Sequence, residues 1–208
     1  MAKKFLSSTK FVVKINPRIL MKDLVVKNDR AMTMLVRGAM EPIVEKASAK
    51  MSKAFEAHPV TQEINSGALA SNLSGTLGGK GNLFSFIGFD SSDRPTQVIS
   101  EILKRKVGIK VNRVGDAGRY KFSLEAPSLE EIYKETPIPW LSQSSWAEGI
   151  EKGISGLGFY LFKPNGAAFS SSGTGLQSKT RVSSVSFSTT PYLEALLKNF
   201  QKDLTKSS

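Results

Sequence analysis

The sequence predicts an α+β fold, in which an antiparallel sheet packs against a long, kinked N-terminal helix and a C-terminal helix, with extended loops between the elements. Two periodicities predict it. Apolar residues recur three or four positions apart near each end of the chain, and they alternate at period two in adjacent segments between these ends. Composition is typical of globular proteins, since 40% of the 208 residues are hydrophobic and 23% are charged. We therefore expect a single α+β domain over residues 1–208.

The first expected elements are a short strand and a long helix. Residues 10–15 (KFVVKI) predict the strand, which ends at an Asn-Pro pair. Asn28 or Asp29 can cap the helix that follows, and His58 at its far end can meet the terminal carbonyls. Pro42 lacks the N–H that would bond the carbonyl four residues earlier, so it should kink the helix or begin a second one. The residues expected along the apolar face of this helix are Ala31, Met34, Leu35, Gly38, Ala39, Ile43, Ala47, Met51, Ala54 and Phe55.

The glycine-rich stretch 66–82 has the composition of a phosphate-binding loop but not its pattern. A Walker loop needs four residues between its glycines, and then Lys followed by a Ser or Thr hydroxyl. Only three residues separate Gly75 from Gly79, and Gly81 stands where the hydroxyl is needed. The next segment, Leu83–Phe89, predicts a strand rather than the helix that would receive the anion. We therefore expect a mobile or turn-forming loop between two elements.

A helix and a hairpin are expected in the middle of the chain. Asp93, followed two residues later by Pro95, is typical of a capped helix with proline in its first turn. Residues 107–114 and 119–126 then alternate at period two around a Gly-Asp-Ala-Gly turn, which predicts a β-hairpin.

The region after the hairpin is less regular. Residues 127–157 form a Pro- and Trp-containing insertion whose WAEGIEKGI stretch predicts a short helix. Residues 158–163 and 181–188 predict strands, the second of them bulged. Between these strands, residues 165–179 are rich in Gly and Ser and predict an exposed loop or arm.

The last segment, TTPYLEALLKNFQKDL, predicts the C-terminal helix. Thr190 can cap it, and Pro191 suits its first position because the missing N–H has no partner there. The side chains expected to be buried are Leu193, Leu196, Leu197 and Phe200.

Net charge is the global property that departs most from average: 29 Lys and Arg against 18 Asp and Glu give +11. Such an excess favours polyanions or acidic protein surfaces as neighbours, although a merely solvated face is an alternative. The basic residues best placed to face DNA or a partner are Lys104, Arg105, Lys106, Lys110 and Arg113. The absence of cysteine excludes disulfides, thiolate metal sites and a cysteine nucleophile.

The sequence does not indicate catalysis. His58 is the only histidine, so a histidine zinc site is excluded and capping explains the residue more simply. The carboxylates that an enzyme could use are Glu41, Glu45, Asp90 and Asp93, but helix surfaces and caps account for them. We expect no enzyme activity, cofactor or metal. We also expect no membrane span or export signal, since no apolar run approaches about 20 residues.

The chain contains the segments RGAMEPIVEKASAKM, SGALASNLSGTL and TTPYLEALLKNF. These three segments resemble parts of the tail-completion or neck proteins, which join head to tail in long-tailed bacteriophages. RGAMEPIVEKASAKM resembles their kinked first helix, with a proline after an Ala-rich turn. SGALASNLSGTL matches their Gly- and Leu-containing lead into the first sheet strand, and TTPYLEALLKNF resembles their closing helix. The likeness covers the first 90 or so and last 30 or so residues. The middle, with its tryptophans and prolines, departs from the compact family pattern by its length.

The resemblance implies a structural virion protein, made in the host cytoplasm, that forms a homo-oligomeric ring in the neck. Its partners would be the head connector or adaptor and the tail tube or tail terminator, with DNA passing through the lumen without sequence readout. Glycine-rich loops would suit arms that order only on a neighbouring subunit. The glycines concerned are Gly75, Gly78, Gly79, Gly81, Gly166, Gly173 and Gly175.

The alternative is a basic nucleic-acid-binding protein. LFSFIGF and RYKFSL would place aromatic and basic residues on strands, where they could stack on bases. The same aromatic residues are equally suited to a core, and no RNA-binding signature is present.

Overall fold

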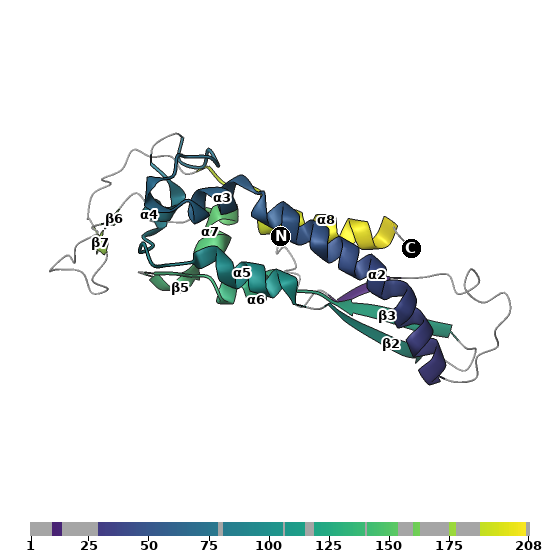
Figure 1. The fold of residues 1–208 in the computed structure, drawn as a ribbon. Helices are drawn as coiled ribbons and strands as arrows, with labels where there is room; N and C mark the ends of the chain where they lie inside the picture. The colour runs from purple at the N-terminus through teal and green to yellow at the C-terminus, as the bar shows by residue number, and fades with distance from the viewer. Residues whose placement is uncertain are drawn as a thin grey trace.

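The computed structural model is a mixed helix and sheet protein and describes residues 10–13, 29–78, 81–105, 107–114, 119–139, 141–153, 160–162, 175–177 and 188–206 (Figure 1). Its helices are α2 (Asp29–Glu56), α3 (Pro59–Asn65), the 3-10 helix η1 (Gly67–Leu69), α4 (Leu83–Ile87), α5 (Pro95–Lys104), α6 (Leu129–Lys134), α7 (Trp146–Lys152) and α8 (Leu193–Lys206). Its strands are β1 (Lys10–Val13), β2 (Gly108–Val114), β3 (Arg119–Glu125), β4 (Pro137–Ile138), β5 (Leu141–Ser145), β6 (Tyr160–Phe162) and β7 (Gly175–Gln177).

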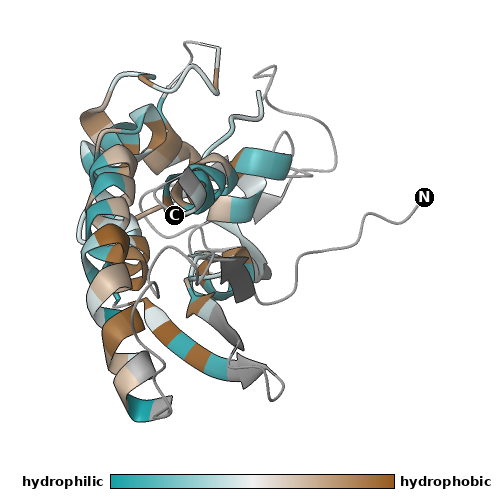
Figure 2. Cartoon of the chain, turned by 90° about the vertical axis from the view of Figure 1, so that its right-hand side faces the viewer, coloured by the Kyte–Doolittle hydropathy of each residue, from teal (hydrophilic) through white to brown (hydrophobic). Residues whose placement is uncertain are grey.

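The predicted α+β class is confirmed. An antiparallel sheet of order β1-β3-β2 packs against the two long helices, with β2 beside α2 and β1 beside α8. The predicted hairpin is formed, since Val114 pairs with Arg119 and Gly108 with Glu125, while its turn at 115–118 lies outside the described residues. Figure 2 shows hydrophobic and hydrophilic residues alternating along β2, as a strand with one buried face requires.

The long helix α2 continues through Pro42, so the alternative that a second helix begins there is wrong. Its buried residues are Val36, Met40, Val44, Ala47, Met51 and Phe55. Ala47, Met51 and Phe55 were expected on this face. Over the first half of the helix, however, the buried residues lie about one position after the residues that were expected to be buried. Apolar residues there occupy more than one stripe along the helix, so the spacing alone does not select the buried one. Met34, Leu35, Gly38, Ala39 and Ala54 are exposed, and Ala31 and Ile43 are half-buried.

Leu83–Ile87 is the helix α4, which corrects the predicted strand. Asn82 caps it by accepting a hydrogen bond from the Ser85 N–H at 2.9 Å. Gly88 ends it in the left-handed region, with a φ of 88°. A short apolar run is compatible with helix or strand, and here the cap residue and the terminal glycine decide the outcome.

The glycine loop between α3 and α4 is fixed by its own chain. Thr76 and Leu77 are buried, and the Thr76 carbonyl accepts from the Ser188 N–H at 2.8 Å. Turns are made at Gly75 and Gly78, whose φ values of 70° and 59° favour glycine. The described part of this loop is therefore held by contacts within its own chain, its role as an assembly arm stays a prediction, and Gly79 lies outside the described residues.

The predicted arm at 165–179 contains a strand. Gly175 begins β7, which pairs antiparallel with β6, and this pairing confirms a strand within the predicted segment 158–163. Gly166, Gly173 and nearly all of the predicted strand 181–188 lie outside the described residues.

Two helix starts differ from prediction. Pro95 is the first residue of α5 as expected, but the Asp93 carboxylate accepts from the Asp90 N–H at 2.8 Å instead of capping the helix. The last helix begins at Leu193, two residues beyond Pro191, so Thr190 is not its cap. Leu193, Leu196, Leu197 and Phe200 are buried as predicted.

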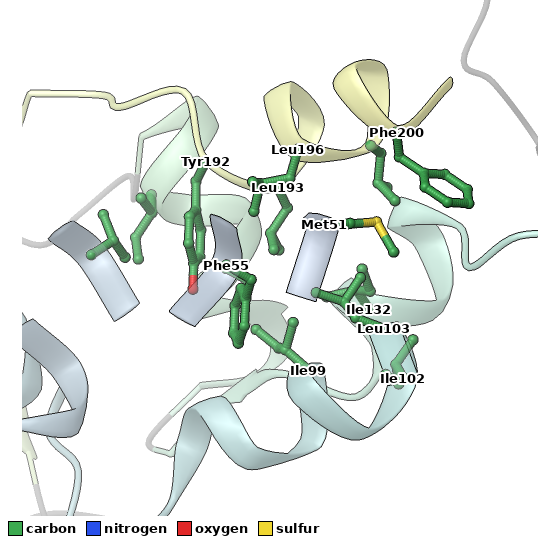
Figure 3. Close-up of a cluster of buried hydrophobic side chains, with 14 of the residues drawn as sticks. Met51, Phe55, Ile99, Ile102, Leu103, Ile132, Tyr192, Leu193, Leu196 and Phe200 are labelled. Atoms are coloured by element: carbon green, nitrogen blue, oxygen red, sulfur yellow. The ribbon is translucent and has the colours of Figure 1, made fainter. Parts of the chain in front are cut away.

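The core joins residues from distant parts of the chain. Figure 3 shows Met51 and Phe55 of α2 between Tyr192 and Leu196 from the C-terminal segment and Ile99 of α5. The insertion 127–157 contributes too: Trp146 at the start of its predicted short helix is buried, and its ring meets that of Phe89 edge-on at 5.8 Å.

Candidate functional site

The predicted basic cluster does not form an uncompensated patch where it is described. Lys104 pairs with Glu56 at 3.1 Å, Arg105 with Glu131, and Lys110 with Glu125 at 2.5 Å. These carboxylates belong to different elements, α2, α6 and β3. Lys106 lies outside the described residues, as does the side chain of Arg113. Local pairing therefore offsets the charge of the three placed residues, as on a solvated face.

The stacking surface proposed for LFSFIGF is absent. Phe84 is buried on α4, its ring 5.5 Å from that of Phe89, and Phe86 is half-buried. These rings belong to the core, because the segment is a helix and not a strand, with Phe84 inside the buried cluster and Phe86 packed against it. The side chains of Tyr120 and Phe122 on β3 lie outside the described residues.

His58 links the start of α3 to the segment just before α8. It is the N-cap of α3: its Nδ1 accepts from the Val60 N–H at 3.3 Å, and its Nε2 lies 3.2 Å from the Pro191 carbonyl just before α8. It was expected to meet carbonyls at the end of the preceding helix, so its role as a cap holds but its partners differ. Both contacts are satisfied by the neutral imidazole with the proton on Nε2. Burial lowers the pKa of His58, while the Pro191 carbonyl and Glu151 oppose the shift.

Glu151 of α7 fixes the start of α8. Its Oε1 accepts from the N–H groups of Tyr192 and Glu194, at 3.1 and 2.6 Å, and its Oε2 accepts from the Tyr133 hydroxyl. Burial and the neighbouring Glu151 raise the pKa of Tyr133. Burial likewise raises the pKa of Tyr192, whose hydroxyl lies 2.8 Å from Thr61 Oγ1. Each polar group is used by another part of the fold, so this cluster is structural.

The carboxylates considered for catalysis are not assembled around a cavity. Glu41 and Glu45 lie four residues apart on α2. Asp90 and Asp93 are joined by a hydrogen bond from the Asp90 N–H to the Asp93 carboxylate, within the turn before α5. Across the residues that the structure describes, no group of three or more Asp, Glu or His could hold a metal ion. The hollow beside Asp93 is lined also by Asn65, Arg94 and the first residues after α3, with a volume of about 400 Å³.

Within the described parts of the chain, four large apolar side chains are exposed, two on α2 and two in the glycine loop. Met34 and Leu35 on α2 are 60% and 48% exposed, and Leu69 and Leu73 in the glycine loop are 100% and 52% exposed. We call these pairs the α2 patch and the loop patch. Sequence reasoning missed the α2 patch, because helical periodicity assigned its residues to the core. Clustering of exposed apolar residues is typical of protein–protein contact sites.

A groove runs between α2 and α8, which lie antiparallel: Lys50 pairs with Asp203 at 2.8 Å, while Phe55 stacks on Tyr192 at 5.9 Å. Two hollows of about 400 and 520 Å³ lie along this α2–α8 groove, and both are bounded by Lys50 and Asp203. The first hollow is lined also by Met51, Ala54, Leu196, Asn199, Phe200 and Lys202. The second is lined also by Pro42, Ile43, Lys46 and Ala47.

Comparison with known proteins gives no match: no family model fits the chain, and no curated protein or solved structure is significantly similar to it. Among the helices described here, none is both long and apolar enough to cross a bilayer. Function has to be inferred from the residues and their arrangement.

Proposed function

We propose that this protein is a structural component of a tailed bacteriophage virion, forming a ring in the neck that completes the tail and joins it to the head connector. The observation that carries the proposal is the separation of the α2 patch from the loop patch. Figure 1 places the start of α2, beside β2 and β3, at the opposite end of the molecule from α3 and α4, which flank the loop. The spine between them, α2, has 28 residues and is therefore about 42 Å long.

Two different patches on one chain favour head-to-tail contacts. An interface that joins unlike surfaces leaves each copy with one free surface of each kind, so assembly continues. It closes as a ring where the rotation between neighbouring copies closes, and extends as a filament where it does not. A single self-complementary patch would instead stop at a dimer. Full burial of an exposed side chain of this kind contributes about 1.5–3 kcal/mol, and Met34, Leu35 and Leu73, which are about half exposed, contribute about half as much.

The resemblance of the α2, loop and α8 segments to neck proteins provides the biological setting for such a ring. A ring-forming structural protein agrees with the hydrogen bonds by which His58 and Glu151 hold the fold together, and with the burial of the aromatic side chains in the core. The overall charge of +11 still favours the nucleic-acid alternative. Phe84 and Phe86 do not support it, because they lie on the helix α4 and not on a strand where they could stack on bases.

The head-to-tail contact can be tested with two half-interface variants. M34Q/L35Q removes the α2 patch and L69S/L73S removes the loop patch. The four positions are exposed, so these substitutions should change the stability of the fold little. We expect each variant alone to sediment as a monomer, because neither has both halves. Their mixture should form a dimer, since the remaining loop patch of one fits the remaining α2 patch of the other.

Sedimentation velocity of the wild type, each variant and the equimolar mixture measures this. Oligomers in either variant alone, or a mixture that stays monomeric while the wild type assembles, would reject the unlike-patch contact. The neck role itself is tested by supplying L69S/L73S in place of the wild-type protein during infection. Filled heads and separate tails are expected in electron micrographs, and normal virions would contradict the role. Salt-dependent retention of oligonucleotides by the wild-type monomer would favour the alternative.

A further inference from the structure

The α2–α8 groove has an apolar floor between charged walls. The floor lies over the buried side chains of Met51, Leu196 and Phe200. The apolar side chains that reach solvent along it are exposed Pro42 and Ala54 and half-buried Ile43. The small side chain of Ala54 leaves the floor open to a ligand. The groove residues differ from those of the α2 and loop patches, so a function here is independent of the head-to-tail contact.

Each wall carries one lysine that has no acidic partner among the residues that the structure describes. Lys46 stands on α2 and Lys202 on α8, both are exposed, and each lines one of the two hollows. No carboxylate pairs with either of them within the described residues, whereas Lys50 is held by Asp203 at the junction of the hollows. A ligand that lies along the groove would therefore meet one unpaired positive charge on each wall.

We propose that the α2–α8 groove docks an amphipathic helix of another protein, with apolar anchors along one face and carboxylates on both flanks. Helix-in-groove recognition uses anchors at i, i+3 or i+4, and i+7. The two hollows on either side of the Lys50–Asp203 pair take two such anchors, one each. The 14 residues of α8 give the groove about 21 Å of wall, enough for roughly four turns of a docked helix.

Charge complementarity selects an acidic helix over a second copy of this chain. The groove presents the unpaired Lys46 and Lys202 on a chain that carries +11 overall, so it attracts an acidic segment more strongly than a second copy of this basic chain. The apolar floor selects a helix over nucleic acid, since a phosphate backbone has nothing to bury against Pro42, Ile43 and Ala54.

The probe for the test is a fluorescein-labelled peptide of about 18 residues, with Leu at the anchor positions and Glu on both flanks. A reference peptide has Gln in place of each Glu. Fluorescence anisotropy at about 50 mM NaCl measures binding to the full chain. We expect K46E/K202E to weaken binding of the acidic peptide about tenfold, and the wild type to prefer the acidic over the Gln peptide by a similar factor.

Two control variants separate charge from apolar contact. K53E reverses an exposed lysine on the same helix that does not line the groove, and it should change affinity by less than about twofold. A54K should weaken binding although it adds positive charge, because it fills the floor, and A57K should not, because Ala57 lies outside the groove. Thermal melts show whether each variant is folded. K46Q/K202Q replaces the double reversal if that variant does not fold.

Several results would overturn the inference. The first is that the wild type shows no measurable binding of the acidic peptide. The second is that the wild type binds the acidic and Gln peptides with equal affinity. The third is that K53E and K46E/K202E lose equal amounts of affinity. Displacement of the peptide by a duplex oligonucleotide at lower concentration would reassign the lysines to nucleic acid. Loss of self-association in K46E/K202E would reassign the groove to a second copy.

Discussion

Among single residues, Glu63 contributes most clearly to the fold. Its side chain is 0% exposed, and its carboxylate accepts from Asn72 Nδ2 at 3.0 Å and from the N–H groups of Ser74 and Leu83, both at 2.7 Å. It thereby ties α3 to the glycine loop and to the first turn of α4. A buried carboxylate is tolerated because hydrogen bonds replace its hydration.

We predict that Glu63→Ala lowers the free energy of unfolding by about 3 kcal/mol or more, because buried donors are left without an acceptor. Glu63→Gln should cost less, since its one remaining carbonyl oxygen still accepts. Glu56→Gln is the matched control, because Glu56 is exposed and pairs with Lys104 at the surface, so its loss should stay within about 1 kcal/mol. Urea denaturation measures all three. A Glu63→Ala loss equal to that of Glu56→Gln would refute this role.

His58 should make stability depend on pH in one direction. Because burial lowers its pKa in the folded state, the unfolded chain binds a proton that the folded chain does not. The stability that neutral His58 contributes to the folded state is therefore complete at pH values above its ordinary pKa of 6.5, and it is lost as the pH falls below that value. Protonation also removes the Nδ1 lone pair that caps α3 at the Val60 N–H. Glu151 faces the same site and moderates the effect.

We predict that the wild type loses more thermal stability than His58→Asn when the pH is lowered from about 7.5 to about 5.5. Asparagine keeps a capping acceptor but does not titrate, so the difference between the two melting curves isolates the imidazole. Melting temperatures that fall equally in both proteins would show that other groups control the response.

At the scale of elements, local signals predicted most of the structure. Pro95 began α5, period-two alternation gave the β2–β3 hairpin, and the apolar spacing of α8 gave its buried residues. The errors came where local signals were balanced. Leu83–Ile87 suited either secondary structure, and the first half of α2 offered two apolar stripes, between which only packing against α5, α8 and β2 decides.

At the scale of the whole molecule, the pairing of basic side chains with carboxylates could not be predicted from the sequence. Lys104, Arg105 and Lys110 looked like a basic cluster because they are close in sequence. Their carboxylate partners lie on other elements that only the tertiary fold brings near. The same limit hid the α2–α8 groove, whose walls come from opposite ends of the chain, and the exposure of Met34 and Leu35. Periodicity identifies a helix, but the exposed part of its surface depends on its neighbours.

Net charge and patch chemistry together predict how assembly responds to salt. Copies carrying +11 each repel, whereas the loop patch lies in a stretch, residues 66–78, that contains no charged residue. The screening length shrinks from about 10 Å at 0.1 M to about 3 Å at 1 M salt, so added NaCl weakens the repulsion and leaves the apolar contact intact. Head-to-tail association should therefore strengthen with salt, while binding of the acidic peptide at the α2–α8 groove should weaken. Sedimentation velocity and anisotropy over the same NaCl series measure both trends. Association that weakens with salt would mean that ion pairs, and not Leu69, Leu73, Met34 and Leu35, hold the copies together.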